Sequence, residues 1–89
     1  MKLHVKIYTE HFGIGEQDRP LCEIKAKGCQ HFASDVHHIF PRGMGGSKSK
    51  DYIENLVGVC RECHNKCESG EISKAEQIKI HNRWISTMQ

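Results

Sequence analysis

The chain has 89 residues, five cysteines, seven histidines and a formal charge of +2. A chain this short buries little of its surface, so we expect one domain over residues 1–89 that needs a metal ion or disulfides for stability. Residues 1–13 lack the apolar run of a signal peptide, and no stretch could span a membrane, which predicts a cytoplasmic protein with no membrane partner. In that compartment, clustered cysteines indicate metal binding.

The N-terminal half is predicted to contain two strands. Apolar and polar residues alternate over residues 2–8, which predicts a first short strand. Residues 22–29 (CEIKAKGC) form a tight knuckle in which Gly28 can take a positive φ. Residues 34–40 (SDVHHIF) suit a second strand, and a glycine-rich loop (PRGMGGSKSK) follows it.

The C-terminal half is predicted to contain a further strand and two helical segments. The strand is IENLVGVC, and RECHNKCES after it suits one or two helical turns. Ser73 and Glu76 form a capping box, so a helix is expected from about residue 73 to 87. Its expected core residues are Ile78, Ile85 and Met88, with Trp84 beside them and His81 as a packed structural histidine.

Four cysteines are spaced for a structural zinc site. Cys60 and Cys63 have the C-x-x-C spacing, and Cys22 and Cys29 would supply the second pair. Four thiolates leave no open position on the ion, so its role is architectural, and the site's charge of about −2 brings the total near zero. Two alternatives remain: His31 in place of Cys29, and Cys67 in place of Cys60, although Cys67 better suits a buried apolar residue or a free thiol.

Between and after these cysteine pairs stand residues that suit catalysis. His37, His38 and Asn55 lie between the pairs, and His64 directly follows Cys63. Adjacent histidines can be a plain strand pair, half of a metal site, or a base beside a ligand. A zinc knot would bring all four residues together. The motifs VHHI, ENL and C-R-E-C-H resemble those of the HNH endonuclease family over about residues 20–68.

The resemblance implies an α+β fold: a small ββα-metal core stapled by zinc, here followed by a C-terminal helix. It also implies that His38 is the general base, that Asn55 is the motif asparagine, and that His37 and His64 bind a catalytic ion. Glu68, one turn after His64, is either a further ligand or a solvated helix residue. Asn55 could fix the backbone near His38 or turn its carbonyl oxygen to the ion.

The implied activity is that of a metal-dependent DNA endonuclease or nickase with no small-molecule substrate. The expected cofactors are structural Zn²⁺ and a catalytic divalent ion, Mg²⁺ or Mn²⁺, with Ni²⁺ or Zn²⁺ as alternatives. Phosphodiester hydrolysis needs a base and charge compensation, and imidazole suits the base role near neutral pH. The alternative function is a non-catalytic, zinc-stabilised nucleic-acid-binding module. The oligomeric state stays open.

Basic residues gather around the predicted site. Residues 25–50 contain five of them against one acid, Asp35, which suits a phosphate-bearing partner. One geometric condition applies: neighbouring strand side chains point to opposite faces, so the strand must end or twist near His37 and His38. The candidate phosphate contacts are Arg42, Lys48, Lys50 and Lys66.

Overall fold

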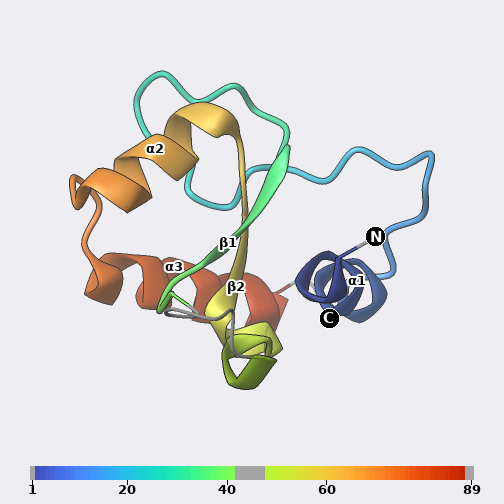
Figure 1. The fold of residues 1–89 in the computed structure, drawn as a ribbon. Helices are drawn as coiled ribbons and strands as arrows, with labels where there is room; N and C mark the ends of the chain where they lie inside the picture. Colours follow the sequence, from blue (N-terminus) through green and yellow to red (C-terminus); the bar gives the residue numbers. More distant parts are fainter. Residues whose placement is uncertain (1, 42–47, 88–89) are drawn as a thin grey trace.

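A two-stranded antiparallel sheet lies among three helices in the computed structural model, which describes residues 2–41 and 48–87 (Figure 1). This arrangement confirms the predicted α+β class. Short 3-10 turns precede the second strand at Lys48–Lys50 and Ile53–Asn55. The helices are α1 (Leu3–His11), α2 (Arg61–Ser69) and α3 (Lys74–Thr87), and the strands are β1 (Asp35–His38) and β2 (Leu56–Val59).

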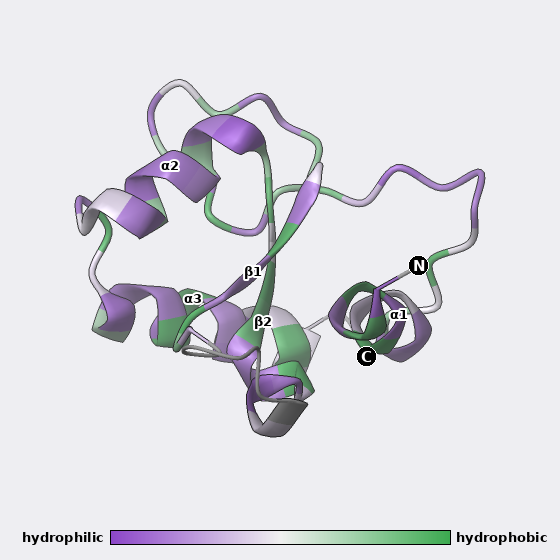
Figure 2. Ribbon diagram, viewed as in Figure 1, coloured by the Kyte–Doolittle hydropathy of each residue, from purple (hydrophilic) through white to green (hydrophobic). Residues whose placement is uncertain are grey.

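The sheet is the centre of the core. Strand β2 (LVGV) is buried at every position, and Figure 2 shows it as mainly hydrophobic whereas α2 is mainly hydrophilic. Such a run suits a strand covered on both faces. The register pairs Asp35 with Val59 and His38 with Leu56. Both expected strands of the core are therefore confirmed, with shorter bounds than the sequence predicted.

The first predicted strand is wrong, because residues 2–8 belong to helix α1. Tyr8 is buried on this helix, half-buried His4 lies one turn before it, and the exposed fraction of Leu3 is 40%. The Tyr8 and Phe12 rings also pack one turn apart, with centroids separated by 4.8 Å. Packing on the sheet every fourth residue therefore overrides the local alternation of apolar side chains.

Helix α3 begins as predicted, but its most buried residues are polar. The Ser73 hydroxyl accepts the Glu76 N–H at 3.1 Å, which confirms the Ser73 half of the predicted capping box. The fully buried residues of α3 are Gln77 and His81, whereas Ile78 and Ile85 are only half-buried. Met88, also expected in the core, lies outside the described residues. The predicted face is therefore confirmed in part: Ile78 packs against the core and His81 is the expected packed histidine, whereas the fully buried positions are a polar pair that forms specific hydrogen bonds.

His81 forms a buried ion pair with Glu23, and the hydrogen bonds of this pair connect α1, β2 and α3. Its Nδ1 lies 2.6 Å from Glu23 Oε1 and its Nε2 lies 2.6 Å from the Ile53 carbonyl oxygen, so both nitrogens donate. The other Glu23 oxygen accepts the Tyr8 hydroxyl and the Gly58 N–H. Burial alone lowers the pKa of His81, but the bonds to Glu23 outweigh it and raise that pKa.

We expect His81→Leu to lower the free energy of unfolding by about 3–5 kcal/mol, because it leaves the Glu23 carboxylate buried without its partner. The raised folded-state pKa of His81 stabilises the fold fully below about pH 6.5, and this contribution is lost as pH rises through the raised value. Urea denaturation at several pH values measures both effects. Asn82→Leu, at the exposed neighbouring position, is the control. An equal loss in both variants would contradict the prediction.

Candidate active site

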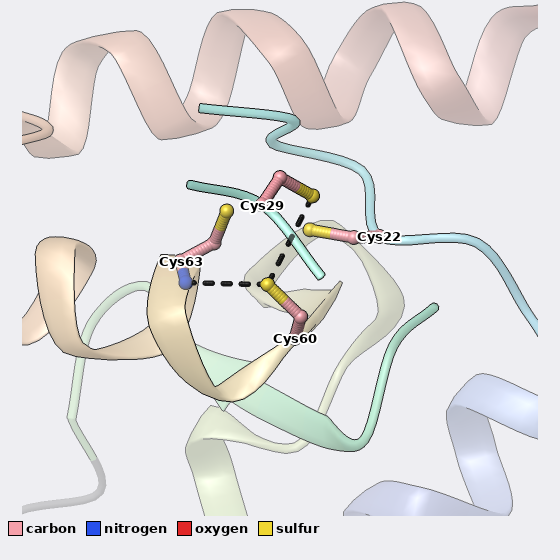
Figure 3. A group of neighbouring side chains, drawn as sticks. All are labelled: Cys22, Cys29, Cys60 and Cys63. Atoms are coloured by element: carbon pink, nitrogen blue, oxygen red, sulfur yellow. Dashed lines mark hydrogen bonds between the residues drawn. The ribbon is translucent and has the colours of Figure 1, made fainter. Parts of the chain in front are cut away.

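The four predicted zinc ligands converge at the start of α2 (Figure 3). Their sulfur atoms lie within 4.8 Å of one another, and the Sγ atoms of Cys29 and Cys60 are 3.9 Å apart. Zinc with four sulfurs at about 2.3 Å requires S–S separations of about 3.8 Å, so this set fits tetrahedral zinc. Neither alternative ligand belongs to the cluster among the described residues: His31 and Cys67 both lie outside it.

Backbone N–H groups aimed at the Cys60 sulfur favour its thiolate. Burial raises the pKa of Cys29 and Cys63. Burial also raises the pKa of Cys60, but N–H groups donated by Gln30 and Cys63 outweigh it and lower that pKa to about 7. The knuckle turns as predicted, with Gly28 at a φ of 83°. A preformed cluster of four sulfurs suits a structural cation, whose binding would release the remaining thiol protons.

A second group of metal-ligating side chains lies between β1 and α2. Candidate ligand atoms of His37, His64 and Glu68 all lie within 4.8 Å of one another. His37 is buried on β1, whereas Glu68 is exposed on α2 and its Oε1 lies 3.1 Å from His64 Nε2. The structure therefore brings together the two histidines predicted as ligands and the glutamate that was left open. Two imidazoles and a carboxylate can hold a divalent ion and leave positions for water or phosphate.

Two further residues orient these histidines. Asp35 Oδ2 lies 2.8 Å from His64 Nδ1, so Nδ1 donates and Nε2 faces Glu68. Gln77 Oε1 lies 3.0 Å from His37 Nε2, while the Gln77 amide nitrogen donates to the Ile72 carbonyl at 2.8 Å. That second bond fixes the Gln77 amide with its oxygen toward His37, so Nε2 carries the hydrogen and Nδ1 remains available to an ion.

Sequence reasoning did not assign these two residues to the site. Asp35 lies two positions before His37 on one strand, and the strand period could have placed both side chains on the same face. Gln77 lies on α3, forty positions away in sequence, and no local signal links it to the histidine pair. Burial is the main cause that lowers the pKa of His37, and the charge of nearby His64 lowers it further. The lowered pKa favours the neutral form of the ring, which is the form that binds metals.

His38 points to a different set of partners. Its Nε2 lies 2.8 Å from Asp51 Oδ1, and its ring centroid is 4.7 Å from that of His4 on α1. The His38 side chain is 16% exposed and that of Asp51 only 1%. Donation from Nε2 to this carboxylate leaves Nδ1 as the nitrogen that can accept a proton. Neither Asp51 nor His4 was identified from the sequence.

Both histidines nevertheless reach one groove. Strand β1 ends at His38, as the geometric condition required, and the groove lies at this end of the strand. Its volume is about 390 Å³, and His37, His38 and His64 all line it. Opposite faces of a strand can therefore serve one site where the strand stops.

Asn55 fixes the backbone around this strand end. Its Oδ1 accepts the Phe40 N–H at 2.8 Å, and its Nδ2 donates to the carbonyls of Phe40 and Lys50, each at 3.0 Å. The Asn55 carbonyl on the main chain also accepts the Ile39 N–H at 2.9 Å. Of the two roles open from the sequence, the structure has the backbone one, because the amide oxygen faces Phe40.

The basic residues predicted to contact phosphate differ in their surroundings. Lys66 donates to the Lys27 carbonyl at 2.6 Å and pairs with Glu71 at 3.4 Å, so its ammonium is used within the fold. Lys50 lies near Phe40, with its Nζ 5.9 Å from the centroid of the Phe40 ring. Lys48 begins the first 3-10 turn, and Arg42 lies outside the described residues.

Comparison with known proteins decides the family. The family described as HNH endonuclease matches residues 21–70. The chain belongs to this family. The HNH match contains the four clustered cysteines and the histidine and asparagine motifs, in agreement with the resemblance over about residues 20–68. It does not include His4 or Gln77, which therefore come to the site from outside the matched HNH segment.

Two curated relatives of this HNH protein come from phages. The Gene 4 proteins of Mycobacterium phages D29 and L5 are each 33% identical to it over 64 residues. The alignment covers 71% of the chain and 59% of each relative, so the HNH chain spans about three fifths of their length. No solved structure matches. Within the described residues, no helix combines the length and apolar character needed to cross a bilayer.

Proposed function

We propose that the protein is a divalent-metal-dependent DNA endonuclease or nickase that hydrolyses phosphodiester bonds. Membership of the HNH family implies nuclease-type activity. The observation that carries the proposal is the groove of about 390 Å³, which is lined both by the candidate metal set and by His38, whose ring is held by Asp51. A nucleic-acid-binding module would need neither feature.

In this proposal His38 accepts a proton from the attacking water at Nδ1. The Asp51 carboxylate accepts a hydrogen bond from Nε2 at 2.8 Å, which fixes both the tautomer and the orientation of the ring. Contact with the tilted ring of His4, at 4.7 Å between centroids, limits movement of the His38 ring. Asn55 holds the backbone that follows His38 and so keeps the base at the strand end.

His37 and His64 would hold the catalytic ion, with Glu68 as an additional oxygen ligand. When bound, a divalent ion supplies charge compensation at the phosphoryl and leaving oxygens. The carboxylate favours Mg²⁺ or Mn²⁺, and the two imidazoles also suit Ni²⁺ or Zn²⁺. Gln77 and Asp35 keep the histidine nitrogens directed toward the ion.

Plasmid nicking by the zinc-loaded protein tests the function. Conversion of supercoiled DNA to the open circular form is expected on addition of Mg²⁺, Mn²⁺ or Ni²⁺, and not without added metal. If no metal supports nicking while the protein binds DNA, the non-catalytic nucleic-acid-binding module is the correct function instead.

Asp51→Asn is expected to lower the nicking rate about 10- to 100-fold, because an amide does not stabilise the tautomer and charge of His38 as a carboxylate does. The metal concentration for half-maximal rate should stay unchanged, since Asp51 is not part of the candidate ligand set of His37, His64 and Glu68. Glu54→Gln, a charge-neutralising change at a nearby exposed position, is the control. A rate equal to that of the wild type would show that Asp51 does not position the base.

A further inference from the structure

An exposed aromatic ring stands beside the groove. Phe40 follows β1, and its exposed fraction is 40% although Ile39 before it is 1% exposed. An isolated exposed apolar side chain is common and proves nothing by itself. Phe40 differs from such a residue because its backbone is held on both sides and two ammonium groups lie near its ring.

The backbone of Phe40 is fixed on both sides of its Cα atom. The Asn55 amide accepts the Phe40 N–H at 2.8 Å and donates to the Phe40 carbonyl at 3.0 Å. The same amide bonds the Lys50 carbonyl at 3.0 Å, so one buried side chain joins Phe40 to Lys50. A ring carried on such a backbone loses little conformational entropy when it contacts a ligand.

Two ammonium groups converge on this ring from different parts of the chain. The Nζ atoms of Lys50 and of Lys74, at the start of α3, each lie 5.9 Å from the ring centroid, which is within cation–π range. Within residues 2–41 and 48–87, neither ammonium forms an ion pair with a carboxylate. Both charges therefore remain available to a phosphate.

The cluster is continuous with the candidate active site. Lys74 lines the same groove as His37, His38 and His64. Lys74 also lies beyond residues 21–70, so this contact is not part of the matched HNH segment. An aromatic face with two cations beside it matches the alternating chemistry of a polynucleotide strand, in which flat bases alternate with phosphates.

We propose that Phe40, Lys50 and Lys74 form a contact for an unpaired DNA nucleotide next to the scissile phosphate. The Phe40 ring stacks on the base, and the two ammonium groups bind the flanking phosphates. This inference rests on the proposed function. Since every base has a π-face, the contact tolerates different sequences and favours single-stranded or locally unpaired DNA over a fully paired duplex.

The test is fluorescence anisotropy with a labelled single-stranded DNA of about 12 nucleotides, with zinc-loaded protein and no other metal added. Phe40→Ala is expected to weaken binding roughly 5- to 150-fold, whereas Phe40→Trp should bind at least as tightly as the wild type. The control is Tyr52→Ala, which removes an aromatic ring of similar exposure, 42%. The wild type should bind an oligonucleotide of abasic sites more weakly than normal DNA, whereas Phe40→Ala should bind the two with nearly equal affinity.

The lysines are tested by the salt dependence of binding. Lys50→Gln and Lys74→Gln should each reduce the slope of log affinity against log salt by about 0.7, the value for one phosphate contact on a single strand. Phe40→Ala should leave that slope unchanged. Lys79→Gln, at an exposed position on the same helix as Lys74, is the control and should retain the wild-type slope.

Two outcomes overturn the inference. One is that Phe40→Ala binds normal DNA as tightly as the wild type does. The other is that Phe40→Ala loses the same affinity, relative to the wild type, on normal DNA and on abasic DNA. Circular dichroism and zinc content establish that each variant is folded. The Phe40 variants are expected to fold because the ring is 40% exposed. A wild type that nicks plasmid while Phe40→Ala binds normally rejects this contact and keeps the proposed function. A wild type that distinguishes abasic DNA but never nicks retains the contact and rejects hydrolysis.

Discussion

Replacing His38 with alanine is expected to reduce plasmid nicking by about 10²- to 10⁴-fold, the usual contribution of a general base. The reason is chemical, because among the described residues that line the groove His38 is the histidine outside the candidate metal set. His37 and His64, which also line it, are directed toward the candidate ion. The measurement is the rate of open-circle formation at saturating metal.

Alanine at this position also leaves the Asp51 carboxylate, 1% exposed, without its bond to His38, so a second variant is needed. His38→Gln can still donate to Asp51 but cannot accept a proton from water, and it should be as inactive as the alanine variant. His11→Ala, at an exposed position near the end of α1, should nick like the wild type. Wild-type rates in His38→Gln would disprove the base role of His38.

Replacing Cys63 with serine is expected to unfold the domain, the largest stability effect anticipated for this chain. Cys63 is fully buried and belongs to the four-sulfur cluster. Structural zinc contributes about 10–16 kcal/mol in zinc-finger peptides, which matches or exceeds the total stability of about 5–15 kcal/mol usual for a domain. Loss of the far-ultraviolet circular dichroism signal, together with loss of bound zinc by mass spectrometry, would measure the effect.

The fifth cysteine provides the matched control. Cys67 lies on the same helix and is also buried, but it is not part of the cluster. Burial raises its pKa to about 11. Cys67→Ala should therefore keep its zinc and cost at most a few kcal/mol. Zinc loss in Cys67→Ala, or a folded Cys63→Ser without zinc, would contradict the assignment.

The features that could be predicted from the sequence depend on the spacing of residues close together in the chain. The C-x-x-C pair predicted two sulfurs at one helix start, and the capping box predicted where α3 begins. The VHHI, ENL and C-R-E-C-H motifs predicted the HNH family, which the match over residues 21–70 confirms. Each depends on residues near one another in the chain, so the backbone geometry of a turn or a strand is enough to decide it.

The features that could not be predicted depend on contacts between distant segments. Tertiary packing made α1 a helix and brought His4 against His38, although its sequence alternates like a strand. It also turned Gln77 and His81 of α3 inward, toward His37 and Glu23.

The sequence by itself determined which residue types surround the candidate metal sites, whereas only the tertiary structure decided which nitrogen of each histidine is available. His38 offers Nδ1 because Asp51 takes Nε2, and His37 offers Nδ1 because Gln77 takes Nε2. The physical reason is that a tautomer is set by the partner of the opposite nitrogen. That partner lies 13 positions away for His38 and 40 for His37, where no local pattern reaches.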